Sequence, residues 1–386
     1  MALPSAWKVR RELERIRVKA VLFTSRWFHD PIRKPIYDLT ARWRQLVTKG
    51  KLPLTDRVTV FVVYQPKGLT GSILITLEHL RRNNYSVLVV SNGPLQSEDR
   101  ETLAAHSAAV MERPNVGYDF GAYRDGIRYL WSLNHDLSLL VLMNDSTWFP
   151  LRRDDDSLAR MEALDADLSG HIFKMEERHK GLQDHIESHL LIISRKFVVS
   201  DDFRRFWLRY RMSDHRATTI RSGEKGFSQF AIRGGWTVKA MMGREWLVDC
   251  LQSRSDQELA QILEHTVDGF QIRMQNADAI RRTADRGEAW HRDYVVWAYQ
   301  CLSNTTPFGL SSSFVMPAMV YGGLGFAKKG RDLPFHFARQ KLLELEARGV
   351  IAPLDEVVRA EIAAAVGIWV SPKGQEGSII CPRPRR

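Results

Sequence analysis

The chain has 386 residues, which is enough for one large domain or two smaller ones. Its 44% hydrophobic and 26% charged residues are ordinary for a soluble globular protein. Of the net charge of +11, +9 falls within residues 1–51, where thirteen Lys and Arg face four acids. Because the remainder is close to neutral, we expect no nucleic-acid groove across the main body.

The three cysteines, Cys250, Cys301 and Cys381, are far apart in the sequence. They have neither the spacing of metal ligands nor that of a disulfide framework. This usage suits a reducing compartment, and the N-terminus has no apolar core of signal-peptide length. We therefore expect a cytoplasmic protein.

The basic N-terminal segment, residues 1–55, is predicted to be an amphipathic arm. Residues 7–23 place apolar side chains at helical spacing among Arg and Lys, and residues 26–48 add Trp, Phe and Tyr. Aromatic and basic residues together suit an anionic membrane surface, which residues 7–48 would contact. The same pattern also fits a helical arm packed on the main domain, or a nucleic-acid-binding arm.

Strands and helices then alternate. Short apolar runs predict strands at 57–64, 85–91, 109–112, 137–143, 165–173, 190–194 and 236–240. Helical spacing predicts helices at 72–82, 97–107, after Gly121 and at 198–210. The order favours an α/β domain over residues 56–250, with a mostly parallel sheet and helices on both faces. We expect residues 251–370 to be more helical and residues 371–386 to be disordered.

The candidate chemistry lies between Asn115 and Ser146. Gly117 and Gly121 would allow a tight bend and a close approach to a ligand. A buried strand then delivers Asn144, Asp145 and Ser146 at its carboxyl end, where open α/β sheets bind ligands. Asp145 could hold a divalent cation against a phosphate, or it could brace the turn after its strand.

Three other features have simpler readings. The acidic run at 154–156 is expected to cap the following helix rather than bind metal. Residues 301–327 carry no charge but contain two prolines and four glycines, so we expect a buried or ligand-facing loop region rather than a membrane span. Glu224 is expected in a glycine-flanked loop, where it could be a site acid or simply exposed.

Several enzyme classes have little support in the sequence. It contains no Gly-x-x-x-x-Gly-Lys phosphate loop and no His-Glu-x-x-His, and the first strand-to-helix turn lacks the dinucleotide-binding glycines. There is no nucleophile elbow either. Hydrolase and dehydrogenase interpretations are therefore weak.

A set of ordered motifs resembles the rhamnan synthesis F protein family, whose fold is of the GT-A glycosyltransferase type. The resemblance covers roughly residues 57–335. Its motifs are Asn115-Val-Gly-Tyr-Asp-Phe-Gly-Ala-Tyr, Leu142-Met-Asn-Asp-Ser-Thr-Trp-Phe-Pro, His185-Ile-Glu-Ser-His-Leu-Leu, Glu224-Lys-Gly-Phe-Ser, Asn304-Thr-Thr-Pro and Gly325-Phe-Ala-Lys-Lys. Departures are Pro307 and Ala327, where the family often has His and Ile. Asn144 also replaces the first acid of the Asp-x-Asp motif, which puts metal dependence in question.

The resemblance implies roles for particular residues. Donor-binding residues would be Asn115, Gly117, Asp119, Gly121, Asn144, Ser146, His185 and His189. Of these, Asn115, Gly117 and Asp119 would hold the nucleoside and ribose of a nucleoside-diphosphate sugar. Asp145 would place a Mg or Mn ion on the diphosphate, and Glu224 would be the base of an inverting transfer. Alternatives remain open, since Asp119 could cap a helix and the two histidines could be ordinary core or surface residues.

The resemblance also implies a function. The chain would move a sugar, rhamnose by the family name, onto a growing bacterial cell-surface polysaccharide or a lipid-linked glycan such as lipopolysaccharide. It would work as a peripheral protein at the inner face of the cytoplasmic membrane, without a nucleic-acid partner. Two other hypotheses are a non-catalytic scaffold that keeps the fold, and a nucleic-acid-binding protein driven by the basic arm.

Overall fold

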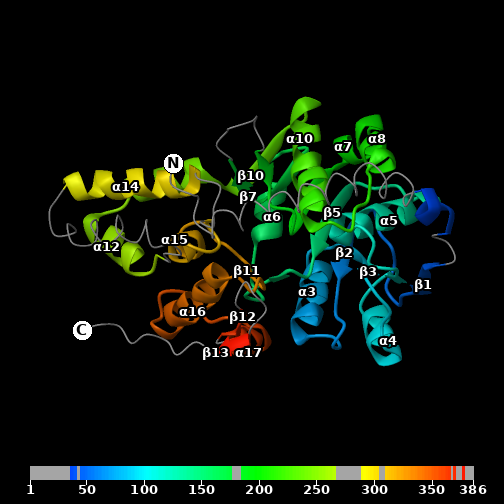
Figure 1. Ribbon diagram of the computed structural model, residues 1–386, viewed down its shortest axis with the longest axis horizontal. Helices are drawn as coiled ribbons and strands as arrows, with labels where there is room; N and C mark the ends of the chain where they lie inside the picture. Colours follow the sequence, from blue (N-terminus) through cyan, green and yellow to red (C-terminus); the bar gives the residue numbers. More distant parts are fainter. Residues whose placement is uncertain are drawn as a thin grey trace, which may run out of the picture.

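The computed structural model describes residues 35–40, 44–175, 184–266, 288–303, 309–366, 368–370 and 376–378. In this part of the chain, a central mixed sheet is covered on both faces by helices (Figure 1). Strand β1 lies at one end of the sheet, and helices α12 and α14 lie at the opposite end of the molecule (Figure 1). The predicted segments 7–34 and 304–307 lie outside the described residues.

The strands of the described chain form one nine-stranded sheet and two small pairs. Their bounds are β1 Leu46–Lys49, β2 Arg57–Val63, β3 Ser86–Ser91, β4 Ala109–Glu112, β5 Leu139–Asn144, β6 Thr147–Trp148, β7 Leu168–Lys174, β8 His185–Ile186, β9 Leu190–Ser194, β10 Val238–Met242, β11 Ala327–Lys328, β12 Ile368–Val370 and β13 Glu376–Ser378. The sheet order is β1-β4-β3-β2-β5-β9-β7-β10, with β8 beside β7. Strands β4, β3, β2 and β5 run parallel, β1 and β9 are antiparallel to their neighbours, and β10 is parallel to β7.

Helices connect most of these strands. Their bounds are α3 Gly71–Arg82, α4 Ser97–Ala105, α5 Tyr118–Ser132, α6 Ser157–Glu162, α7 Arg195–Val198, α8 Asp201–Arg209, α9 Arg216–Thr219, the π-helical turn η2 Ile220–Glu224, α10 Lys225–Arg233, α11 Arg244–Gln252, α12 Asp256–Glu264, α14 Glu288–Ser303, α15 Val315–Val320, α16 Leu333–Ala347 and α17 Glu356–Ala365. Helices α5, α7, α8 and α10 cover one face of the sheet, and α3, α4 and the C-terminal helices cover the other.

The central strands are buried on both faces because their side chains alternate between two hydrophobic cores. In β2, Val58, Val60 and Val62 pack with α5, whereas Phe61 and Val63 pack with α3 and the C-terminal helices. A strand that is buried on both sides reads as a continuous apolar run, which is why β2, β3 and β5 could be located from sequence. The predicted fold class, a mostly parallel sheet flanked by helices, is confirmed.

The described part of the expected N-terminal arm is packed on the sheet domain. Residues 35–40 are helical, and Tyr37 is buried with its hydroxyl donating to Asp125 Oδ2 at 2.5 Å. The carboxylate of Asp38 accepts from Arg124 at 2.8 Å and from Arg128 at 2.9 Å. Strand β1 then extends the sheet beside β4. Residues 35–40 and 46–49 are thus packed on the domain or paired with its sheet.

Two further predictions concern loops. Asp155, rather than Asp156, binds the first turn of α6, since its Oδ1 accepts from the Ser157 amide at 3.1 Å. Residues 310–318 and 324–327 are buried, as expected, and include α15 and the start of β11. None of the described helices is both long and apolar enough to be a membrane span.

One predicted element is wrong. Residues 221–228, predicted as a glycine-flanked loop, are helical: they form the π-helical turn η2 as far as Glu224 and then the start of α10. Gly223 fits here because a Cβ at this position would lie 2.5 Å from the ring of Phe120. Close packing against α5 thus converts a glycine-flanked stretch into a helix.

Candidate functional site

The two central sequence motifs meet at the carboxyl end of β5. Asn144, the last residue of β5, is buried, and its Nδ2 donates to Asp119 Oδ2 at 3.0 Å. Its Oδ1 accepts from the amide of Ser146 at 3.1 Å and from the Ser146 hydroxyl at 2.5 Å. Asn144 therefore joins the first turn of α5 to the turn after β5, and it keeps Asp119 beside the strand end.

Asp145 is partly exposed, and, among the residues that the structure describes, only one of its two carboxylate oxygens is hydrogen-bonded to neighbouring residues. Its Oδ2 accepts from the Tyr64 amide at 2.8 Å and from Gln65 Nε2 at 2.7 Å, which fixes the loop after β2. Burial raises the pKa of Asp145, although these two bonds and the nearby Lys329 oppose the shift. Within the described chain, no hydrogen bond reaches Oδ1. That oxygen remains available to a ligand.

The loop before α5 contains two glycines that its backbone conformation and its packing require. Gly117 has φ of 77°, a left-handed conformation that favours glycine, and its amide donates to Asp214 Oδ1 at 3.2 Å. At Gly121, a Cβ would lie 2.1 Å from the carbonyl oxygen of Val116, so the close turn requires glycine. Asn115, at the start of the loop, is exposed to solvent.

A buried arginine supports this loop from beneath, and sequence reasoning missed it. Arg113 donates to the Val116 carbonyl at 2.7 Å, to Asn92 Oδ1 at 2.5 Å and to Asp125 Oδ2 at 2.6 Å. Its side chain is fully buried, and Tyr37 also bonds to Asp125. The segment 35–40 therefore helps to hold the loop, a link that no local pattern in the sequence could reveal.

Asp119 shares its surroundings with two other acids. Burial, together with the negative charges of Asp145 and Glu224, raises the pKa of Asp119 from 3.8 to about 7. Asp119 does not cap α5, because the N-cap is Gly117 and no side-chain cap bond is present. The buried Tyr123, one turn later on α5, donates its hydroxyl to the Ser188 carbonyl at 3.2 Å.

Glu224 reaches the site from the turn η2. Its Oε1 accepts from the Ser188 amide at 3.3 Å, so the peptide groups of Ser188 lie between Glu224 and Tyr123. Single π-helical turns are frequent at functional sites because they redirect a side chain. The four side chains of Asp119, Asn144, Asp145 and Glu224 are thus brought together from α5, the end of β5 and η2. The buried His185 lies on β8, and the His189 ring contacts His171 and Lys328.

Comparison with known proteins matches residues 87–279, half of the chain, to the family described as Rhamnan synthesis protein F. The chain belongs to this family. The uncharacterized protein y4gN of Sinorhizobium fredii (strain NBRC 101917 / NGR234) is 28% identical over 260 residues, which are 67% of each chain. Among solved structures, the mannosyltransferase PcManGT of Pyrobaculum calidifontis, in complex with GDP-mannose and Mn²⁺, covers 90% of this chain and 96% of its own, with 14% identity and a TM-score of 0.29.

In this member of the rhamnan synthesis protein F family, the two predicted histidines are buried. His189 Nε2 lies 3.2 Å from His171 Nδ1, and its Nδ1 lies 3.3 Å from Lys328 Nζ. Burial holds the pKa of His189 well below its ordinary value. Glu187, with Nζ of Lys174 and Lys328 each at 2.8 Å, completes this buried polar cluster. The His189 ring thus faces the cluster, while its carbonyl accepts from the Asn144 amide at 3.1 Å.

The site offers a divalent cation few protein ligands. In the described ranges, no three His, Cys, Asp or Glu side chains lie close enough to hold a metal between them. Asp145 Oδ1 remains available, and Ser146, the next residue, is exposed, with its hydroxyl donating to Asn144 Oδ1. Magnesium is commonly held by one or two carboxylates together with substrate phosphates. The residues therefore fit a cation whose remaining ligands would come from a diphosphate and water.

Proposed function

We propose that this chain is a glycosyltransferase that moves a sugar from a nucleoside-diphosphate donor to a bacterial cell-surface polysaccharide or a lipid-linked glycan. The observation that carries the proposal is the meeting of Asp119, Asn144, Asp145 and Glu224 at the carboxyl end of the parallel strands. Membership of the rhamnan synthesis protein F family supports polysaccharide as the product and rhamnose as the sugar.

The donor would lie over the strand ends. Asn115 and the backbone of Gly117 and Gly121 would contact the nucleoside, and Asp119 would accept hydrogen bonds from ribose hydroxyls. Asp145 would hold a Mg or Mn ion on the diphosphate, with Asn144 and Ser146 fixing its position through their own bonds. Such an ion would supply positive charge to the leaving group.

Glu224 is the proposed base of an inverting transfer. Its carboxylate would take the proton of the acceptor hydroxyl while that oxygen attacks the anomeric carbon. The bond between this carbon and the diphosphate oxygen breaks in the same step, and the nucleoside diphosphate leaves with the electron pair. His185 and His189 would support the donor site from within the protein rather than line its surface, because their side chains are buried.

The acceptor side is assigned to residues 251–370, which place β11 and α16 beside the strand ends. A lipid-linked acceptor requires work at a membrane, so we place the protein at the inner face of the cytoplasmic membrane. The basic residues of segment 7–48, part of which also packs on the sheet domain, would contact its anionic lipids.

The test is Asp145→Asn, with the exposed Asp136→Asn as its control. Donor hydrolysis and sugar transfer would be measured with a panel of nucleotide sugars, with and without Mn. Loss of one charge-stabilising group of this kind costs about 10²–10³ in turnover. Asp145→Asn should show a loss of this order while melting cooperatively, and the control should be unaffected. Near-normal turnover in Asp145→Asn would remove this residue from the mechanism.

A second candidate is a non-catalytic binding protein with the same fold. It is favoured by the hydrogen bonds of Asp145 Oδ2 and Asn144, which brace neighbouring loops as a purely structural pair would. This alternative predicts that no activated sugar releases its nucleotide, with or without an acceptor and a metal ion.

A further inference from the structure

A cationic group that interacts with Asp145 belongs to a distant part of the sequence. Lys329 follows β11, which pairs antiparallel with β6, and the Lys329 amide donates to the Ser146 carbonyl at 2.8 Å. The turn that delivers Asp145 and Ser146 is thus hydrogen-bonded to the residue that carries the ammonium group. Burial lowers the pKa of Lys329, and the carboxylates of Asp145 and Glu361 oppose this shift.

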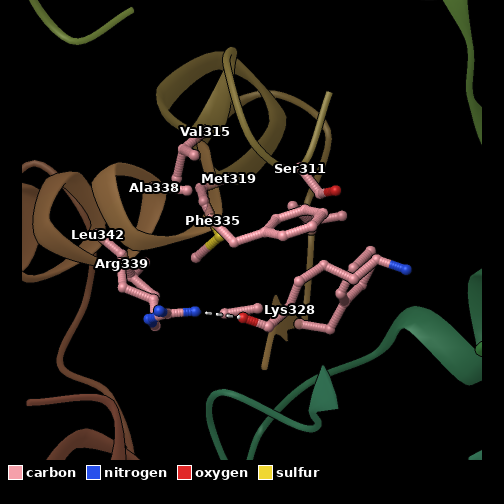
Figure 2. A pocket seen from close by; sticks show the side chains of 11 residues that line it. Ser311, Val315, Met319, Lys328, Phe335, Ala338, Arg339 and Leu342 are labelled. Carbon is pink, nitrogen blue, oxygen red and sulfur yellow. Dashed lines mark hydrogen bonds between the residues drawn. The ribbon is translucent and has the colours of Figure 1, made fainter. Parts of the chain in front are cut away.

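The backbone on either side of Lys329 is firmly held. Arg339 on α16 is buried, and its Nη1 donates to the carbonyls of Lys328 at 3.1 Å and of Gly330 at 2.8 Å. Figure 2 shows this guanidinium pointing toward the Lys328 carbonyl. The ring of Trp148 is in contact with both cations, with its centroid 5.5 Å from Lys329 Nζ and 5.9 Å from the Arg339 guanidinium carbon. The backbone of Lys329 is therefore fixed by hydrogen bonds on both sides.

The ammonium itself is poorly satisfied. It can donate three hydrogen bonds, yet in the described chain it has a single long contact, 3.4 Å to the Ser72 hydroxyl. Lys328, the preceding residue, is different: its ammonium lies 2.8 Å from Glu187 and 3.3 Å from His189 in the buried cluster. The two adjacent lysines thus differ: the Lys328 ammonium is bound in the buried cluster, whereas the Lys329 ammonium, near Asp145, keeps N–H donors that are not used by any described residue.

The charge balance of the site calls for such a group. Asp119, Asp145 and Glu224 surround the place proposed for the donor, and a diphosphate would add further negative charge to it. The buried guanidinium of Arg113 is already bound to Asp125 and Asn92. A cation without a carboxylate partner can contribute most, because hydrogen bonds between charged groups are the stronger ones.

We propose that the Lys329 ammonium binds the diphosphate of the donor and stabilises the nucleoside diphosphate as it leaves. This inference rests on the proposed function and names a binding residue within it. The contact is independent of any metal ion, since it needs only the phosphate oxygens. It therefore favours diphosphates over monophosphates even when divalent cations are removed.

The experiment compares dissociation constants of ADP, GDP, UDP, CDP and dTDP with those of their monophosphates, in EDTA and in Mn. The full-length wild type is compared with Lys329→Met, Lys329→Arg and Lys328→Met. In the wild type, the preferred base should bind more tightly as the diphosphate. Lys329→Met should lose about ten- to hundredfold in diphosphate affinity while monophosphate affinity stays within about twofold.

The two other variants separate binding from structure. Lys329→Arg keeps the charge and should retain part of the diphosphate preference. Lys328→Met should lower the melting temperature, because it leaves Glu187 with one cation fewer, yet it should keep the ratio of diphosphate to monophosphate affinity.

Three outcomes would overturn the inference. If the wild type binds diphosphates and the ratio is unchanged in Lys329→Met, Lys329 does not contact the diphosphate and the proposed function stands. The inference also fails, and the proposed function stands, if the wild type binds nucleoside diphosphates and monophosphates with equal affinity. If no nucleotide raises the melting temperature of the wild type at all, the proposed function fails together with the inference.

Discussion

Replacing Asp119 by Asn should make the protein more stable and weaken its nucleotide binding. The folded state raises the pKa of Asp119 from 3.8 to about 7, chiefly by burial and by the charges of Asp145 and Glu224. At low pH the carboxyl is protonated in both states, and stability is unaffected. As pH rises from about 4 to 7 the unfolded chain releases its proton first, so the folded state loses stability.

The magnitude follows from the shift. About three pKa units correspond to about 4 kcal/mol as an upper limit. Because Asp119 as a residue is only partly buried, solvent screening reduces this to about 1–2 kcal/mol. The amide introduced by Asp119→Asn would carry no charge, and its oxygen could still accept the hydrogen bond from Asn144. At pH 8 the variant should therefore melt about 1–3 °C higher than the wild type, and the gain should shrink below pH 6.

The assay is urea denaturation between pH 4.5 and 8.5, with the exposed Glu101→Gln as a control that should show no such pH-dependent gain. Nucleotide affinity is measured on the same samples and should fall about tenfold if Asp119 accepts ribose hydroxyls. If Asp119 instead stabilised the start of α5 through its negative charge, the variant would lose stability at pH 8. If Asp119→Asn proves less stable than the wild type at pH 8, burial and the charges of Asp145 and Glu224 do not destabilise the ionised Asp119, and the reasoning is refuted.

The remaining predictions concern the base and the N-terminal segment. Glu224→Gln should leave donor affinity within about twofold and cut sugar transfer by about 10²–10⁴, because only proton removal is lost; a fall in donor affinity instead would assign Glu224 to the donor side. Tyr37→Phe should lower the free energy of unfolding by about 1–2 kcal/mol, since Asp125 loses a buried donor. Urea denaturation with Tyr129→Phe as control checks this, and equal midpoints would show that residues 35–40 do not support the loop before α5.

Strands β2, β3 and β5 were predictable because burial on both faces demands continuous apolar runs, and these stand out against the polar helix surfaces. The proximity of Asp119 and Asn144 could also be predicted from the sequence. Helix α5 leads directly to β5, so the start of one and the end of the other lie at the same edge of the sheet. Local order along the chain was sufficient for this half of the site.

Other features depend on contacts that local patterns do not encode. Glu224 lies on a π-helical turn because Gly223 packs against Phe120, which is a tertiary constraint. Tyr37 reaches Asp125 across 88 positions of sequence. Lys329 comes from a segment that the family resemblance had marked, yet nothing in Lys328-Lys329 indicates which ammonium is engaged in the core. Only the pairing of β11 with β6 decides this.

The C-terminal region is bound to the site through several independent contacts. Glu361 on α17 accepts from the Ser72 amide at 2.8 Å and from Trp148 Nε1 at 2.8 Å. The Lys329 amide holds the turn after β5, and α16 holds the backbone around Lys329. The acids of the site come from the first 224 residues, whereas Lys329 comes from the last third of the chain. With the proposed role of Lys329, the site would need both signs of charge, and it would be complete only when the C-terminal helices are folded against the sheet.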